Sequence, residues 1–296
     1  MSEQEGGWRR RQRVIRLVVL PVVVVCLAAV CGPALASADP AARAAVFAGT
    51  GAWVDIYDET IHDPQFVVDE AVAHGIEVIY VETSNYHSPA VVMYPDEVRA
   101  IIALAHPLGI RVVPWYLPGY RNIALDRRRL QAAAEVGGAD LPVDGLGVDI
   151  EADIVRNRAL RARRAAAMVA WLRATYPELA IAGIVPRDAL AWWRIFPYVE
   201  IRAATDAMLP MCYTSRYLTA AQTTAMAAAC VTTIREQTGD PVVPVHVIAG
   251  VTDFLSSRQL VAAARGAKAA GANGFSLYNL ETTAPGDWRA IDVWRG

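Results

Sequence analysis

The chain has 296 residues, a formal net charge of −2 and only 4 cysteines. Without the first 38 residues, which carry five arginines and two glutamates, 258 residues remain with a net charge of −5. That length suits one domain. The acidic balance argues against nucleic acid as a partner, because phosphate binding requires a basic surface.

The first 38 residues have the pattern of an export signal. Five arginines precede an apolar run from Leu17 to Cys31, and the small-residue sequence Ala36-Ser37-Ala38 follows. We therefore predict cleavage before Asp39 and a secreted or extracytoplasmic mature protein. A membrane anchor over residues 14–36 is the alternative. A span needs about 20 apolar residues, and this run reaches that length only across a Gly-Pro pair.

Residues 39–296 alternate short β-rich runs with longer alanine-rich helical patterns, which is typical of a parallel sheet built from βα units. The predicted strands are Ala52–Tyr57, Ile76–Glu82, Ile110–Tyr116, Gly145–Glu151, Ala180–Val185, Ala207–Tyr213, Pro244–Ala249 and Gly274–Tyr278. A (β/α)8 barrel typically takes about 250 residues. We therefore predict an α/β fold, a single (β/α)8 TIM barrel with parallel strands over residues 39–296.

Helices are predicted between these strands. The longest runs from Ile154 to Tyr176 and carries an arginine-rich face, including Arg161, which we interpret as solvated surface. Trp192 and Trp193, after the fifth strand, are assigned to packing.

Polar and aromatic residues gather at the carboxyl ends of the predicted strands, where the active sites of such barrels are built. The candidate site residues are Asp55, Tyr57, Glu82, Trp115, Tyr116, Asp149, Glu151, Tyr213, Asp253, Tyr278 and Asn279. Asn85, Tyr86, His87 and Arg121 follow in the loops. Aromatic rings suit the C–H faces of sugars, while carboxylates and amides bind hydroxyls. For any single aromatic residue, structural packing is the favoured role and sugar binding the alternative.

Asp149 and Glu151 are the sharpest signal in the sequence. Side chains alternate along a strand, so both carboxylates point to the same face. Two neighbouring acids resist ionising together, so one tends to keep its proton near neutral pH. Such a pair suits the general acid chemistry that breaks glycosidic bonds. A solvated acidic strand end is the alternative.

Other chemistries lack a signal. The five histidines are scattered without paired spacing, so no metal site is predicted. No G-x-S-x-G motif is present, and no cofactor is implied. Cys212 and Cys230 are the cysteines that remain after the leader. The sequence leaves open whether they form a disulfide or stay as buried thiols.

Two stretches follow a known pattern: Asp144-Gly145-Leu146-Gly147-Val148-Asp149-Ile150-Glu151 on the fourth predicted strand and Met211-Cys212-Tyr213-Thr214 on the sixth. They resemble the D-G-x-D-x-D-x-E and M-x-Y-D motifs of the family 18 glycoside hydrolases, the chitinase-like (β/α)8 barrels. The resemblance implies that Glu151 protonates the leaving oxygen. It also implies that Asp149 positions the acetamido group of the substrate and that Tyr213 hydrogen-bonds it.

The chain departs from that family at several positions. Gly147 stands in place of the middle Asp, and Thr214 in place of the Asp after the Tyr. The third strand reads Val113-Pro114-Trp115-Tyr116 instead of S-x-G-G, and the eighth ends in Tyr278-Asn279 instead of Trp. Other glycosidase barrels place a second acid after the seventh strand. In that arrangement Glu151 would be the acid/base and Asp253 the nucleophile.

The sequence therefore predicts an exported glycoside hydrolase-like enzyme that cleaves glycosidic bonds of an extracellular or cell-wall polysaccharide by carboxylate acid/base catalysis. Its expected partner is a polysaccharide or oligosaccharide substrate. A non-catalytic carbohydrate-binding barrel at the cell surface is the alternative. A barrel hydrolase or lyase with an unrelated substrate is the third hypothesis, because a fold alone does not determine chemistry.

Overall fold

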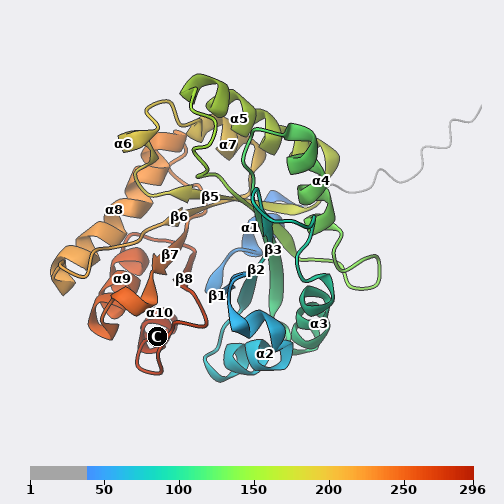
Figure 1. The fold of residues 1–296 in the computed structure, drawn as a ribbon. Coiled ribbons are helices and arrows are strands. Elements are labelled where there is room, and N and C mark those ends of the chain that lie inside the picture. The colour runs from blue at the N-terminus through green and yellow to red at the C-terminus, as the bar shows by residue number, and fades with distance from the viewer. Residues whose placement is uncertain (1–38) are drawn as a thin grey trace, which may run out of the picture. The chain divides into compact units, whose positions relative to one another are not determined.

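The computed structural model describes residues 39–296, and the predicted export signal or anchor lies outside them. Eight parallel strands follow one another around a closed barrel (Figure 1). Their bounds are β1 Gly49–Val54, β2 Val78–Asn85, β3 Arg111–Leu117, β4 Gly145–Asp149, β5 Ala180–Pro186, β6 Ala207–Met211, β7 His246–Gly250 and β8 Gly274–Tyr278. Parallel pairing of β8 with β1 closes the sheet. The predicted (β/α)8 barrel is confirmed.

Helices surround the strands on the outside of the barrel (Figure 1). The α-helices are α1 Pro40–Ala45, α2 Pro64–Ala73, α3 Pro95–Ala105, α4 Ile123–Ala134, α5 Arg158–Thr175, α6 Ala189–Trp192, α7 Tyr198–Ala204, α8 Ala220–Thr238, α9 Ser257–Ala269 and α10 Arg289–Arg295. Short 3-10 helices are η1 Glu59–His62, η2 His106–Leu108 and η3 Thr252–Phe254. Within residues 39–296, no helix is long and apolar enough to cross a membrane.

Side-chain alternation along the strands builds two separate cores. One fills the barrel interior, where Trp53, Tyr80 and Trp115 are its largest members. The other lies between the strands and the surrounding helices. The interior is thus packed solid below the carboxyl ends of the strands.

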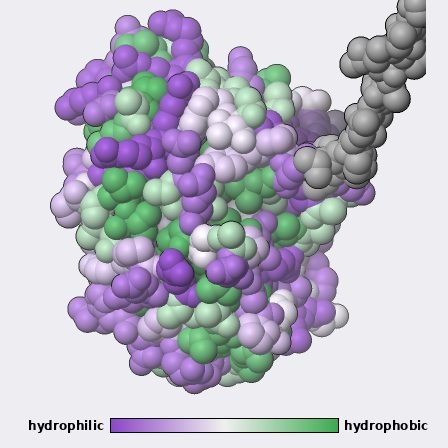
Figure 2. All heavy atoms as spheres, turned by 90° about the vertical axis from the view of Figure 1, so that its right-hand side faces the viewer, coloured by the Kyte–Doolittle hydropathy of each residue, from purple (hydrophilic) through white to green (hydrophobic). Residues whose placement is uncertain are grey.

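The surface on the side of α3 and α4 carries hydrophilic residues interspersed with smaller apolar groups (Figure 2).

One helix boundary and one arginine differ from the predictions. α5 begins at Arg158 and not at Ile154, because β4 already ends at Asp149 and a loop follows. Arg161 is buried, with its guanidinium 4.0 Å from the ring centroid of Trp193, so its assignment to solvated surface is wrong. The cation–π contact accounts for that burial. Trp193 is fully buried, which confirms its packing role.

A disulfide links Cys212, just after β6, to Cys230 on α8. Both cysteines are buried. This contact settles the pairing that the sequence left open. It ties the residue before Tyr213 to a helix outside the barrel.

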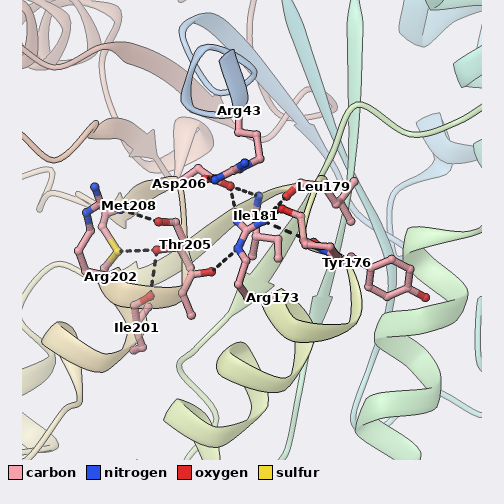
Figure 3. A network of polar contacts seen from close by, with 12 residues as sticks. Arg43, Arg173, Tyr176, Leu179, Ile181, Ile201, Arg202, Thr205, Asp206 and Met208 are labelled. Atoms are coloured by element: carbon pink, nitrogen blue, oxygen red, sulfur yellow. Dashed lines mark hydrogen bonds and ion pairs between the residues drawn. The ribbon is translucent and has the colours of Figure 1, made fainter. Parts of the chain in front are cut away.

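Asp206 organises the amino end of the barrel next to β6 (Figure 3). Its carboxylate accepts hydrogen bonds from Arg43 Nε of α1 (2.9 Å), from the backbone N–H of Ile181 (2.9 Å) and from Arg173 of α5. The Asp206 side chain is 5% exposed. One carboxylate thus joins α1, α5 and two neighbouring strands.

We expect Asp206→Asn to lower the free energy of unfolding by about 3 kcal/mol, because it removes a largely buried carboxylate that pairs with Arg43 and Arg173. Urea denaturation measures the change. Asp153→Asn is the control, since Asp153 pairs with Arg156 in an exposed ion pair, worth about 0–1 kcal/mol. Equal losses in the two variants would contradict this role of Asp206.

Candidate active site

A cleft of about 190 Å³ opens at the carboxyl ends of the strands. Seven of the predicted site residues line it: Tyr57, Glu82, Trp115, Asp149, Glu151, Tyr213 and Tyr278. The remaining lining residues are Trp53, Asn85, Leu117, Ile184, Met211 and Ile248. Trp53 and Met211 lie two positions before a predicted site residue and Leu117 two positions after one, so strand alternation was the signal that could have identified these three. The cleft therefore combines an apolar floor with acids and aromatic rings.

Asp55 lies directly behind the cleft wall. It accepts hydrogen bonds from the Tyr278 hydroxyl (2.9 Å) and from Asn279 Nδ2 (2.8 Å). Asn279 Nδ2 also donates to Asp58 Oδ2 (2.9 Å), which in turn accepts from the backbone N–H of Asp55. Asp55 and Asn279 thus fix Tyr278 from behind and do not line the cleft themselves.

Glu82 lies on β2, in the cleft wall. Its Oε1 accepts from Asn85 Nδ2 (3.1 Å), and the same nitrogen donates to the hydroxyl of Tyr57 (2.7 Å). Burial raises the pKa of Glu82 to about 7, and the charge of Asp55 adds to the effect. Burial likewise raises the pKa of Asp58 to about 7. These carboxyls hold protons close to neutral pH because water is largely excluded around them.

Asp149 and Glu151 stand at the end of β4, as the sequence predicts. Burial raises the pKa of Asp149 well above its usual range, and the charge of Glu151 raises it further. Oδ1 of Asp149 is buried and has no hydrogen-bond partner among residues 39–296. Glu151 is an exposed residue at the mouth of the cleft, yet desolvation by the surrounding wall still raises its pKa. Ionisation of both carboxyls together is unfavourable, because it would place two negative charges close to each other in one site.

Aromatic rings form the apolar part of the cleft. Trp53 stacks on Tyr80 at 4.3 Å between ring centroids and meets the edge of Trp115 at 5.8 Å. The ring centroids of Tyr213 and Tyr278 lie 5.7 Å apart. Nε1 of Trp115 is buried and has no partner within the described chain, like Oδ1 of Asp149. An unpaired donor and an unpaired acceptor among the lining residues suit a polar ligand, because a buried polar atom without a partner is costly.

Gly147 and Trp115 are paired across β3 and β4. A Cβ atom at position 147 would lie 2.9 Å from Cβ of Trp115 and 2.9 Å from Cδ1 of Ile184. Cβ of Trp115 and Cδ1 of Ile184 therefore occupy the space that a side chain at position 147 would need. The two neighbouring strands leave no room for an Asp at the place where the family 18 motif has one.

Two predicted site residues lie elsewhere. Tyr116 points out of the barrel, where its hydroxyl donates to Asp126 (2.7 Å) behind β3. It neighbours Trp115 in sequence, and successive strand residues face opposite sides. Asp253 is exposed on η3 and does not line the cleft. β7 ends at Gly250, and the chain turns away before it reaches Asp253.

Metal chemistry has no support in the described residues. No group of three or more His, Cys, Asp or Glu side chains in residues 39–296 is arranged to hold a metal ion. Glu82 of the cleft accepts hydrogen bonds from Asn85 Nδ2 (3.1 Å) and from the backbone N–H of Ile56 (3.4 Å). The arrangement can bind hydroxyl-rich ligands and can donate a proton from Glu151.

Comparison with known proteins identifies the fold. No model of a known protein family matches the sequence, and no curated protein matches it. A chitinase from Bacteroides thetaiotaomicron has a similar structure, with 9% identity and a TM-score of 0.62, over 83% of this chain and 94% of that one. The spore cortex-lytic enzyme of Bacillus cereus has 11% identity and a TM-score of 0.59, over 83% and 74%.

A chitinase-like agglutinin from Robinia pseudoacacia has 14% identity and a TM-score of 0.51, over 82% of this chain and 99% of that one. At these identities the likeness shows the fold alone. The chain has the fold of chitinases and chitinase-like proteins, and the roles of its residues must be argued from its own geometry.

The raised pKa values predict how stability depends on pH. The ordinary pKa values of Asp58 and Glu82 are 3.8 and 4.5, and both are about 7 in the folded protein. At pH values between the ordinary and the raised pKa, the unfolded chain releases protons that the folded protein keeps. The free energy of unfolding therefore falls as pH rises from about 4 to 7. We expect a loss of roughly 1 kcal/mol per pH unit for each group. Melting temperatures across this range measure it.

Glu82→Gln should flatten this slope, because it removes one of the buried carboxyls whose pKa is raised. The exposed Glu236→Gln is the matched control and should keep the wild-type slope. Identical slopes in all three proteins would show that the buried carboxyl of Glu82 does not titrate as described.

The steric pairing of positions 115 and 147 gives a second prediction. Gly147→Ala should destabilise the fold by about 1–3 kcal/mol through overpacking. Part of that cost should disappear when Trp115→Gly is present, since the closest Cβ is then removed. A double-mutant cycle in chemical denaturation measures the coupling. Strict additivity would refute the contact.

Proposed function

We propose that this protein is a glycoside hydrolase, in which Glu151 is the general acid. The observation that carries the proposal is the Asp149–Glu151 pair: one carboxyl is buried with an unpaired oxygen, and the other stands at the mouth of the same cleft with a raised pKa. A raised pKa keeps Glu151 protonated closer to neutral pH, as a proton donor to a leaving oxygen must be.

Residues from other strands raise the pKa of Asp149, the acid behind Glu151, in addition to burial. Position 147 carries no carboxylate, but the charges of Glu82 and Asp55 act on Asp149 in addition to that of Glu151. Acids from β1 and β2 thus supply the negative surroundings that keep Asp149 protonated. In the proposed reaction Asp149 donates a hydrogen bond to the substrate and Tyr213 a second one from the opposite wall.

The aromatic rings and the polar rim support a sugar as the ligand. Trp53, Trp115 and Tyr278 offer flat apolar faces to the C–H bonds of a ring, and Asn85 and Tyr57 lie where hydroxyls would be bound. The solved structures of similar fold include chitinases and a spore cortex-lytic enzyme. We propose an extracellular or cell-wall polysaccharide as the substrate.

Export is part of the proposal. The Arg-rich apolar leader supports it, and so does the disulfide between Cys212 and Cys230. Disulfides persist mainly in oxidising compartments outside the cytosol.

Glu151→Gln should lower the release of reducing ends from a chitin and peptidoglycan panel by roughly 10²–10⁴-fold, because it removes the proton while keeping the shape of the side chain. Its melting temperature should stay at the wild-type value. Asp253→Asn is the control, since that exposed acid lies outside the cleft, and it should keep its activity. Loss of activity in Asp253→Asn alone would move the catalytic role to that residue.

A non-catalytic carbohydrate-binding barrel is the second candidate. The absence of a carboxylate at position 147 favours it, and a chitinase-like agglutinin shares the fold. It predicts saturable glycan binding that survives Glu151→Gln, with no reducing ends released by the wild-type protein.

A further inference from the structure

A second cavity of about 230 Å³ adjoins the cleft on the same end of the barrel. The loops after β2, β3 and β4 line it, each with at least one residue. The lining residues that matter here are Tyr86, His87, Arg121, Asn122, Arg129 and Ile154. None of them lines the cleft itself.

The chain connects the two cavities at three points. Three residues of the cleft are each followed, within three positions, by a residue of the second cavity. Asn85 is followed by Tyr86, Leu117 by Gly119, and Glu151 by Ile154. Three residues of extended chain span at most about 11 Å. A glycan bound in the cleft would therefore present its neighbouring unit to the second cavity.

The junction between the two is built from an aromatic ring. Tyr86 and Ile154 both pack on Gly119, where an added Cβ would lie 2.7 Å from Cβ of Tyr86 and 2.8 Å from Cδ1 of Ile154. The negative charges of Asp153 and Glu151 contribute to raising the pKa of Tyr86, after burial. The ring thus stands within the field of Glu151 and offers a flat face to a sugar that leaves the cleft.

The second cavity differs from the cleft in charge. Arg121, Arg129 and His87 line it, whereas no basic side chain of the described chain lines the cleft. Arg129 is buried, donates to the backbone carbonyl oxygens of Asn85 (2.8 Å) and Ala90 (3.3 Å), and keeps an unpartnered buried Nε. Arg121 is exposed, and its Nη2 donates a hydrogen bond to the carbonyl oxygen of Ile154 (3.4 Å). Within residues 39–296, neither guanidinium is in an ion pair.

Asp126 is the one acid among the described residues that line this cavity, and it lies near Arg129. Its carboxyl oxygens accept from the Tyr116 hydroxyl and from the backbone N–H groups of Gly119 and Tyr120. Burial raises its pKa, while these hydrogen bonds and the charge of Arg129 lower it. Arg121, which has no ion pair within residues 39–296, therefore stays available to a ligand in this cavity.

We propose that this second cavity is a subsite for an anionic sugar unit, which recognises a carboxylate on the glycan through Arg121 and the positive field of Arg129. The proposal rests on the proposed glycan-binding function of the cleft. An uncharged unit occupies the cleft, where no basic side chain of the described residues could pair with a carboxylate, and the carboxylate-bearing neighbour lies against Tyr86. The substrate is thus an acidic glycan in which charged and uncharged units are adjacent.

Titrations on the Glu151→Gln protein test the subsite without turnover. Three oligosaccharides of equal length serve as probes: one of N-acetylglucosamine alone, one in which alternate units carry a lactyl carboxylate, and one in which alternate units are uronic acids. We expect tighter binding of at least one carboxylated probe, and the preferred one identifies the source of the carboxylate. The preference should shrink as salt is added, because Arg121 is exposed.

Arg121→Gln should lower the ratio of affinities between the carboxylated and the neutral probe about tenfold, the effect of losing one charge-assisted hydrogen bond. Arg128→Gln is the matched control, since Arg128 is an exposed arginine of α4 that lines neither cavity. It should keep the ratio.

The other outcomes separate the two proposals. Binding of the neutral probe with no preference for either carboxylated one, or a ratio that Arg121→Gln leaves unchanged, overturns the subsite and leaves the cleft as a glycan site. Absence of binding for all three probes overturns both proposals.

Discussion

Closure of the sheet by the β1–β8 pair is the constraint on which the site depends. It brings Asp55 within 2.9 Å of the Tyr278 hydroxyl, although the two residues are 223 positions apart in the sequence. It also brings the carboxyl ends of the other strands to one rim, so acids of β2 and β4 share a single cleft. In an open sheet these edge strands would part, and the hydrogen bonds that hold Asp55 and Asn279 behind the wall would be lost.

A rim formed in this way concentrates like charges. Acids from β1, β2 and β4 lie close enough to raise one another's pKa values, and the residues of the described chain that line the cleft include no base. The protein compensates with neutral donors: tyrosine hydroxyls, asparagine amides and backbone N–H groups. The result is a site whose carboxyls keep their protons close to neutral pH, next to a cavity that two arginines line.

The sequence predicted the fold and much of the cleft because both follow from alternation. Regular β-rich runs identified all eight strands, and the alternation of side chains along a strand placed Asp149 and Glu151 on the same face. The same alternation rules out Tyr116 as a cleft residue once Trp115 points into the barrel, so the wrong prediction for Tyr116 could have been avoided. Asp253 could not have been placed, because its position depends on how the chain turns after β7. The burial of Arg161 was equally hidden, since its contact with Trp193 joins two segments whose approach depends on the packing of the whole barrel.

The contact between Trp115 and Gly147 also constrains the order in which such a site can change. A lineage that acquired a side chain at position 147 first would pass through an overpacked interior, because Cβ of Trp115 already fills the space. Loss of the indole alone would not open that space, because the Cβ of any side chain other than glycine at position 115 stays in place and Cδ1 of Ile184 lies equally close. A side chain at position 147 therefore requires changes at positions 115 and 184 first, so two neighbouring strands limit which substitutions the middle of β4 tolerates.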